Sequence, residues 1–206
     1  MTVTAHEWGW SGRSLLISGP TEEPITVADA NAHLRVDTYD DEITIEGLIT
    51  TARLRVEQDT GRALITQTWD FYWDDVPPSS TLLLPKAPIQ SVTSVTSYND
   101  SDVAAVLAAT NYRVDTVSEP GRLTLTSSGS WPSDVRDTNA FVVRAVCGYG
   151  AAAAVPRPLT QAMLLLIGSL YEQREQVLIT QFAGQFIEMP FGYRELISPY
   201  RLTWVC

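Results

Sequence analysis

The sequence predicts an α+β protein, in which a helical bundle from both chain ends carries an inserted antiparallel β lobe and an extended C-terminal tail. Three observations predict this fold class. Apolar residues recur with a helical period up to about residue 60 and again after residue 156. They alternate with a period of two in residues 67–149, and Pro and Gly interrupt the segment after residue 188. Such segregation of helices and strands is typical of α+β domains.

These patterns divide the chain into segments of different character. We expect an N-terminal arm at 1–20, a discontinuous helical module at 21–66 and 151–188, an antiparallel β module at 67–150, and a C-terminal docking tail at 189–206. Residues 1–20 show no clear periodicity, so they are compatible with either an arm or an edge strand.

The first helix has a clear start. Thr26 is followed three residues later by Asp29, which is the spacing of a capping box. Val27, Ala30 and Leu34 then share one helical face. The pattern predicts a helix that begins directly after Thr26.

The second helix is expected at about residues 41–60. Acidic residues 40–42 place negative charge at the positive end of its dipole, and Gly61 is a suitable left-handed stop. One face is a stripe of Ile45, Leu48, Ile49, Ala52 and Val56.

The β module contains several short strands separated by turns. Trp69, Phe71 and Trp73 alternate with polar residues, which favours a buried core face over a stacking platform for sugars or bases. Cys147 alternates inward with Val143 and Ala145, as a buried and inert thiol would.

The third helix, from Leu159 to about Gln176, is apolar on most sides. Such a helix is covered on most sides, either by its own domain or by a partner. We take Leu159, Met163, Leu166 and Leu170 as a possible intersubunit face, with burial in the subunit's own core as the alternative.

The charge balance argues against tight nucleic-acid binding. The chain carries 14 Lys and Arg against 24 Asp and Glu, a formal net charge of −10. A protein that grips DNA needs a basic patch to release counterions, and no basic run occurs here. Neither a secretory signal nor a membrane span is evident, so we expect a product made in the host cytoplasm without membrane contact.

The sequence offers no convincing active site. The two His residues, His6 and His33, and the two Cys residues are too scattered for a zinc set. No nucleophile elbow and no phosphate-binding Gly loop occurs. We therefore expect no catalytic residues, no metal and no cofactor.

Short motifs in order along the chain resemble a known family. They are residues 23–26 (EPIT), 33–37 (HLRVD) with 40–41 (DD), 57–64 (EQDTGRAL), 67–69 (QTW), 84–89 (LPKAPI) with 91–95 (SVTSV), 112–115 (YRVD) with 120–122 (PGR), 131–132 (WP), 148–150 (GYG), 171–175 (YEQRE) and 196–201 (LISPYR). Together they resemble the head–tail connector, or adaptor, proteins of long-tailed phages and gene transfer agents. Residues 1–20 match none of these motifs, and residues 99–110 lack the Gly-containing turn expected between strands.

This resemblance implies a structural role in the neck of a virion or gene transfer agent particle. Such a subunit forms a ring, usually of twelve, that joins the portal protein to the stopper or tail and extends the DNA exit channel. DNA would slide past an acidic lining without tight binding. We expect Leu196, Pro199, Tyr200 and Arg201 in the closing motif to dock on the portal, unless this tail folds back on its own subunit.

Other functions remain open at this point. A different neck component such as a stopper is the nearest alternative. From another class, the β lobe and its tryptophans are compatible with a carbohydrate-binding or host-surface module. A small hydrolase is the third possibility.

Overall fold

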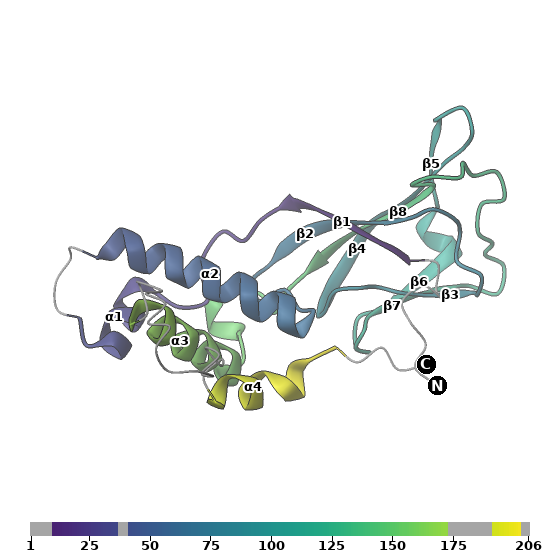
Figure 1. Ribbon diagram of the computed structural model, residues 1–206. Coiled ribbons are helices and arrows are strands. Elements are labelled where there is room, and N and C mark those ends of the chain that lie inside the picture. Colours follow the sequence, from purple (N-terminus) through teal and green to yellow (C-terminus); the bar gives the residue numbers. More distant parts are fainter. Residues whose placement is uncertain (1–9, 37–40, 173–190, 203–206) are drawn as a thin grey trace, which may run out of the picture. The chain divides into compact units, whose positions relative to one another are not determined.

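The computed structural model describes residues 10–36, 41–172 and 191–202. It is a mixed α and β structure with antiparallel sheets, as the sequence predicts (Figure 1). The chain forms two compact units. The sheet unit consists of residues 10–21, 61–149 and 202, and the helical unit consists of residues 22–36, 41–60, 150–172 and 191–201.

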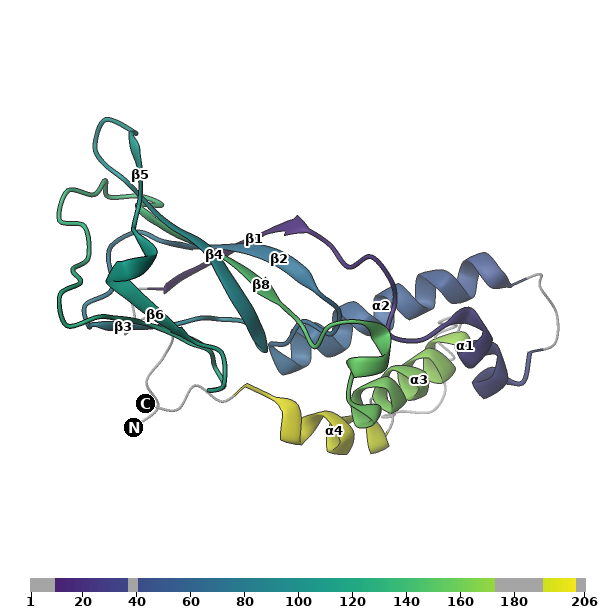
Figure 2. The same ribbon diagram turned by 180° about the vertical axis from the view of Figure 1, so that it is seen from behind.

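The sheet unit contains two antiparallel sheets. Its strands are β1 (Trp10–Ser18), β2 (Gln67–Trp73), β3 (Thr81–Leu83), β4 (Ile89–Tyr98), β5 (Ala104–Val106), β6 (Tyr112–Asp115), β7 (Arg122–Leu125) and β8 (Phe141–Cys147). Five strands pair in the order β1-β2-β8-β4-β5, and three pair in the order β3-β7-β6. Figure 2 shows the two sheets from behind.

The hydrophobic core of this unit draws on both sheets. In the five-stranded sheet Phe71 lies opposite Val143 and Trp73 opposite Phe141, so the alternating positions of β2 and β8 point to one face. The rings of Trp73 and Phe141 meet edge to face at 6.2 Å. Leu82 and Leu123 of the smaller sheet belong to the same buried cluster. The alternation seen in the sequence therefore marks the face that packs.

The opposite face of the five-stranded sheet, which also carries Val142 and Val146 of β8, holds a paired charge. Asp70 and Arg144 are cross-strand partners. The Nε and Nη2 atoms of Arg144 each donate a hydrogen bond to the Asp70 carboxylate, both at 2.7 Å. Asp70 is buried beneath this fork, whereas Arg144 is partly exposed. Bidentate pairing of this kind adds geometric specificity, so it pins the register of β2 against β8.

Residues 10–18 form the edge strand β1, which pairs with β2. The alternative of an edge strand is thus correct for this part of the first twenty residues. Leu15, Leu16 and Ile17 are all exposed on it. Among the described residues β1 is the outermost strand of its sheet. Exposed apolar side chains at a sheet edge are a surface that proteins normally cover or protect.

The turn between β4 and β5 is made without glycine. Asp102 adopts the left-handed conformation with φ 58°, which Asp tolerates better than most residues. The Asn99 side-chain oxygen accepts hydrogen bonds from the backbone N–H groups of Ser101 and Val103. These Asx-type bonds replace the Gly-containing turn that the family resemblance implied.

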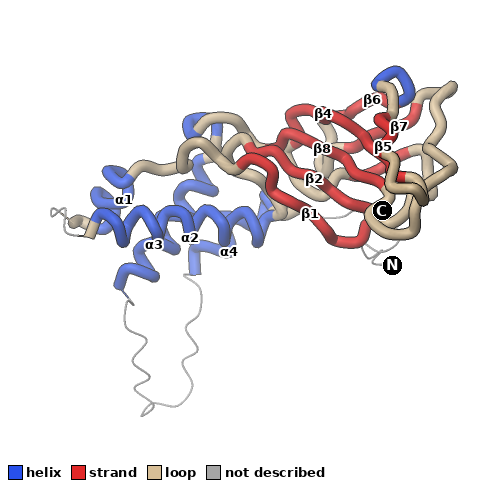
Figure 3. The backbone as a smooth tube through the Cα atoms, turned by 90° about the horizontal axis from the view of Figure 1, so that it is seen from above, coloured by secondary structure: helices blue, strands red, loops and turns tan. Residues whose placement is uncertain are grey.

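The helical unit is built from four α-helices in the described residues (Figure 3). They are α1 (Val27–Leu34), α2 (Glu42–Thr60), α3 (Arg157–Glu172) and α4 (Phe191–Ile197), with 3₁₀-turns η3 (Ala152–Ala154) and η4 (Ser198–Tyr200). Helix α1 packs on α2 and α3, and α4 packs on α3 and contacts α2.

The predicted helix starts and stops agree with the structure. Thr26 and Asp29 form both hydrogen bonds of a capping box, at 3.0 and 3.1 Å between backbone N–H and side-chain oxygen. Helix α2 ends at Thr60, and Gly61 follows with φ 72°. The Asp41 carboxylate accepts a hydrogen bond from the Tyr171 hydroxyl at 2.7 Å, which ties the start of α2 to the end of α3.

The prediction of an irregular, extended tail from residue 189 is wrong for residues 191–201. They form α4 and η4, and Tyr193 and Ile197 are buried in the helical unit. These two residues are four apart and so share one face of a helical turn. The residues before Phe191 and after Leu202 in this predicted segment lie outside the described part.

Candidate functional site

The described His, Cys and acidic side chains form no metal site. Within the described residues no group of three or more His, Cys, Asp or Glu side chains is placed to hold a metal ion. His33 is exposed near the end of α1, and His6 lies outside the described part.

The aromatic triplet of β2 belongs to the core. Phe71 and Trp73 are each 1% exposed, so neither ring offers a face to a sugar or a base. Trp69 is half-buried, and the Lys86 ammonium lies 4.6 Å from the centre of its ring. This confirms the core interpretation and removes the stacking platform on which a carbohydrate-binding module was based.

Cys147 is fully buried at the end of β8, as its alternation predicts. Burial raises the pKa of its thiol to about 12. Since the thiolate is the reactive form, this cysteine is inert at neutral pH.

The proposed intersubunit face of α3 is mostly covered by the chain itself. Leu159 and Met163 are fully buried and Leu166 is 7% exposed, whereas Leu170 is 37% exposed. The first three are therefore covered within the subunit and leave no surface for a neighbouring one. Their burial in the subunit's own core, the alternative stated for this helix, is correct.

Residues 191–201, which we call the closing segment, are bonded to α2 at Asp59. Asp59 accepts a hydrogen bond from the Tyr193 hydroxyl at 2.8 Å and from Arg55 Nε at 2.9 Å. Burial raises the pKa of Tyr193, and the neighbouring Asp59 raises it further. The backbone carbonyl of Asp59 also accepts a hydrogen bond from Arg201 Nε at 3.1 Å. Residues 191–201 are thus held on their own helical unit.

The four predicted docking residues lie on the outside of this segment to different extents. Leu196 and Tyr200 are half-buried, and Pro199 and Arg201 are exposed. They follow one another on α4, η4 and the residue after it, so the structure brings them into one short stretch of surface.

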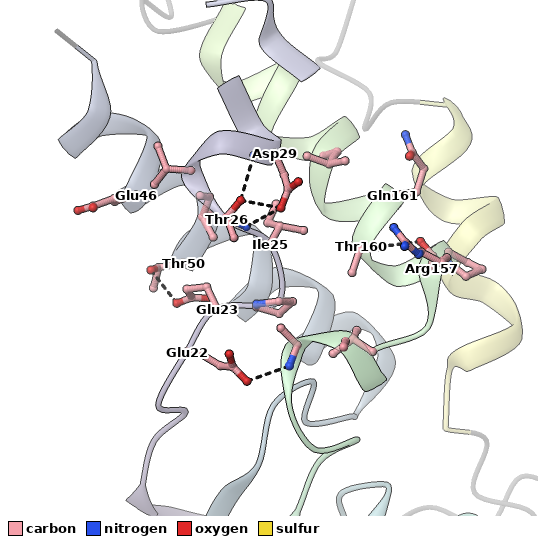
Figure 4. Close-up of a pocket in the computed structure, with 18 residues that line it drawn as sticks. Glu22, Glu23, Ile25, Thr26, Asp29, Glu46, Thr50, Arg157, Thr160 and Gln161 are labelled. Atoms are coloured by element: carbon pink, nitrogen blue, oxygen red, sulfur yellow. Dashed lines mark hydrogen bonds between the residues drawn. The ribbon is translucent and has the colours of Figure 1, made fainter. Parts of the chain in front are cut away.

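A groove in the helical unit was not predicted from the sequence. Its volume is about 1040 Å³, and its walls come from the segment before α1, the first half of α2, η3 and the start of α3 (Figure 4). Its charged lining residues are Glu22, Glu23, Asp29, Glu46 and Arg157. We call this feature the acidic groove. The lining holds four carboxylates and one guanidinium, and one of the carboxylates, Glu23, is paired with Arg53 behind it.

The floor of the acidic groove is apolar. Ile25, Ile49 and Val155 are 6%, 2% and 5% exposed, and Leu164 is half-buried. Figure 4 shows Arg157, Thr160 and Gln161 from α3 on one side, with Glu23, Thr50 and Glu46 on the other. The lining comes from three stretches of the chain that are far apart in sequence, so no local motif predicts the groove.

Hydrogen bonds within the chain fix the walls of the groove. Glu22 accepts a bond from the backbone N–H of Ala152 at 2.9 Å. Glu23 accepts bonds from the Thr50 hydroxyl at 3.0 Å and from Arg53 Nε at 2.8 Å. These bonds hold the loop before α1 against η3 and α2.

The fold is that of chains in known particle structures. A chain from the neck of an empty gene transfer agent (GTA) particle, computed with C6 symmetry, matches with a TM-score of 0.77 and 23% identity, over 94% of this chain and 97% of that one. A chain from the virion of a native GTA particle matches with 0.75 at the same identity and coverage. A chain from the neck of a native GTA particle, computed with C12 symmetry, matches with 0.69 and 23% identity over 93% and 97%.

Two other comparisons find nothing. No protein-family model matches the chain, and no curated protein sequence matches it. None of the helices in the described residues has the length and apolar character to cross a membrane.

Proposed function

We propose that this protein is a structural subunit of the neck of a gene transfer agent or tailed phage particle, where it acts as the head–tail adaptor between the portal and the stopper or tail. The observation that carries the proposal is the shared fold over 97% of a chain from a GTA particle neck. The ordered motifs across residues 23–201 support the same assignment from the sequence.

In this role the subunit forms a ring of twelve. The necks that share its fold were computed with C6 and C12 symmetry, which supports a cyclic arrangement. A ring needs a heterologous contact that closes on itself, so each subunit must present two different surfaces to its neighbours. Exposed Leu15, Leu16 and Ile17 on the edge strand β1 offer apolar surface that such a contact would cover.

The ring surrounds the path by which DNA leaves the head, and its lining is acidic. The chain's net charge of −10 supports this, because like charge repels the phosphates and lets the duplex slide. DNA is thus a passing cargo, and catalysis has no part in the role. A basic lumen in a structure of the assembled ring would contradict this point.

Leu196, Pro199, Tyr200 and Arg201 form the portal-docking surface on the folded segment of α4 and η4. An exposed guanidinium beside aromatic and apolar side chains has the composition of binding hot spots. Deletion of everything after Met189 would also remove buried Tyr193 and Ile197, so it is a poor test. The variant Pro199→Ala/Arg201→Ala keeps buried Tyr193 and Ile197 and removes one bond of the segment, from Arg201 to the Asp59 carbonyl. Arg194→Ala on the exposed side of α4 is its control.

The decisive experiment mixes the purified chain with the portal protein of its own particle and images the product by electron microscopy. We expect a ring on the portal, with binding weakened at least tenfold in the Pro199→Ala/Arg201→Ala variant and unchanged in Arg194→Ala. A chain that stays monomeric and does not bind the portal protein would refute the neck assignment. Full binding by the double variant would refute only the docking surface.

A further inference from the structure

We propose that the edge strand β1 of one copy is extended by a strand from a second copy, formed by residues 177–183 in the segment between α3 and α4. The proposal rests on the proposed function in one respect, which is that a ring places a second copy beside each subunit. The two surfaces of this contact differ from each other, as a heterologous ring contact requires.

The outer edge of β1 presents backbone hydrogen-bonding groups. Residues of an antiparallel strand bond alternately to the strands on either side. The bond from the Leu107 N–H to the Val95 carbonyl fixes this alternation at β4. Carried through the registers of β4, β8 and β2, it turns the backbone groups of Leu15 toward Asp70. The N–H and C=O of Leu16 therefore point away from the sheet, and no strand of the described residues lies on that side.

The side chains of this edge are apolar and uncharged. Leu15 and Leu16 are 54% and 43% exposed, and neighbouring residues of a strand point to opposite faces. A strand added here meets an apolar side chain on each face of the sheet. Residues 14–18 (SLLIS) lack the charges and Pro that commonly protect a sheet edge. Register shifts on either side of residues 13–16 limit the added strand to a few residues.

Residues 177–183 (VLITQFA) have the composition of such a strand. They belong to an uncharged stretch without Pro, residues 176–187, and are rich in residue types that favour strands. The stretch lies between Glu172, where α3 ends, and Phe191, where α4 begins. At ~3.3 Å per residue, half of the connecting chain extends about 30 Å, which is enough to reach across a contact between adjacent subunits.

A second copy is the occupant that the charges favour. Each copy carries a net charge of −10, so two copies repel one another over much of their surface. Residues 14–18 and 176–187 carry no charge, and a contact between them avoids this repulsion. Main-chain hydrogen bonds supply the affinity when a peptide adds a strand to a sheet edge, so no ion pair is needed.

The first test cross-links two populations of the full-length chain, both carrying Cys206→Ser. One carries Leu16→Cys and the other Ile179→Cys, and Cys147 is buried and inert. They are mixed, alone or with the portal protein of their own particle, and treated with a bifunctional maleimide. The matched control replaces Leu16→Cys by Val106→Cys, which lies at the opposite edge of the same sheet and is 69% exposed.

The second test measures association by sedimentation, with and without the portal protein. Leu16→Pro removes the outward N–H and leaves the groups of Leu15 that face β2. Val106→Pro is its control, because the neighbouring Leu107 bonds to β4 and the Val106 N–H therefore points outward from β5. If Leu16→Pro unfolds the chain, the cross-linking result decides alone.

We expect Leu16→Cys chains to cross-link to Ile179→Cys chains at least tenfold more than Val106→Cys chains do. Association should weaken at least tenfold in Leu16→Pro and less than threefold in Val106→Pro. Mass spectrometry of the cross-linked peptides identifies the joined residues.

Equal cross-linking by the Val106→Cys control, or equal association by a folded Leu16→Pro chain, would overturn the proposal. A chain carrying both Leu16→Cys and Ile179→Cys that cross-links only to itself would show that its own segment covers β1. A chain that stays monomeric under both conditions would also overturn it. Cross-linked copies that do not bind the portal would refute the neck assignment alone, and a portal-bound ring without the cross-link would refute only the added strand.

Discussion

The hydroxyl of Tyr193 should stabilise the closing segment on its own helical unit. The Tyr193→Phe substitution keeps the buried ring and removes only the hydrogen bond to Asp59 at 2.8 Å. Hydrogen bonds to charged groups contribute about 1.5–3 kcal/mol. Because Asp59 keeps its bond from Arg55, it is not left without a partner, and we expect a loss of about 1–2 kcal/mol.

The assay for this effect is amide hydrogen exchange of peptides that cover residues 191–201. Exchange through local opening reports the stability of one segment, even where global unfolding is not two-state. A loss of about 1–2 kcal/mol corresponds to exchange that is about 5- to 30-fold faster, since 1.4 kcal/mol is tenfold. Peptides from β8 should exchange at unchanged rates.

Tyr112→Phe is the matched control, because Tyr112 lies in β6 of the sheet unit. It should leave the exchange of residues 191–201 unchanged. Equal exchange in Tyr193→Phe and the wild type would refute the role given to the hydroxyl. Unprotected exchange of this segment in the wild type would refute the docked α4 altogether and would restore the extended tail.

Three further predictions concern the sheet unit and α2. Gly148→Ala should destabilise the protein by roughly 3 kcal/mol or more in urea unfolding, because φ is 120° and the new Cβ would lie 2.3 Å from a backbone oxygen. Gly47→Ala is the control: it has open space around it and should stabilise α2 by about 0.5–1 kcal/mol. The hydrogen bond from Arg62 lowers the pKa of Glu119. This pair therefore stabilises the fold above pH ~4.3, and its contribution is lost as the pH falls further. Glu119→Gln should reduce the dependence of the unfolding free energy on pH in this acid range. Of the chain's two thiols, Cys147 should resist a thiol reagent at pH 8 until urea unfolds the protein.

The elements that the sequence predicts well are those with a local physical cause. The stripe on α2 is buried at Ile45, Ile49, Ala52 and Val56, because a regular period places all four on one face. The alternation of β2 likewise marks its packed face. In both cases the pattern within one element identifies the apolar face that packs, but it does not predict the buried charged residues Arg53 and Asp70.

Helix α4 is not predicted from the sequence, because its local residues favour irregular structure. Pro190, Gly192 and Pro199 argue against a helix, and only one turn separates Tyr193 from Ile197. The helix owes its place to tertiary contacts, among them the Tyr193–Asp59 hydrogen bond. The sequence shows that Tyr193 and Ile197 are four residues apart, but it does not show which residues of α2 and α3 they contact.

The apolar surplus of α3 changes meaning once its neighbours are known. From the sequence, a helix apolar on most sides needs cover, and an adjacent subunit was one source of it. Helices α1, α2 and α4 supply that cover within the chain, and Leu165 meets α4 near Gly192. Leu159, Met163 and Leu166 are therefore no longer evidence for a ring. In the proposed ring, the contacts between subunits would come from surfaces that stay exposed after folding, such as Leu15, Leu16 and Ile17 on β1. A local apolar pattern in the sequence does not distinguish such a surface from core.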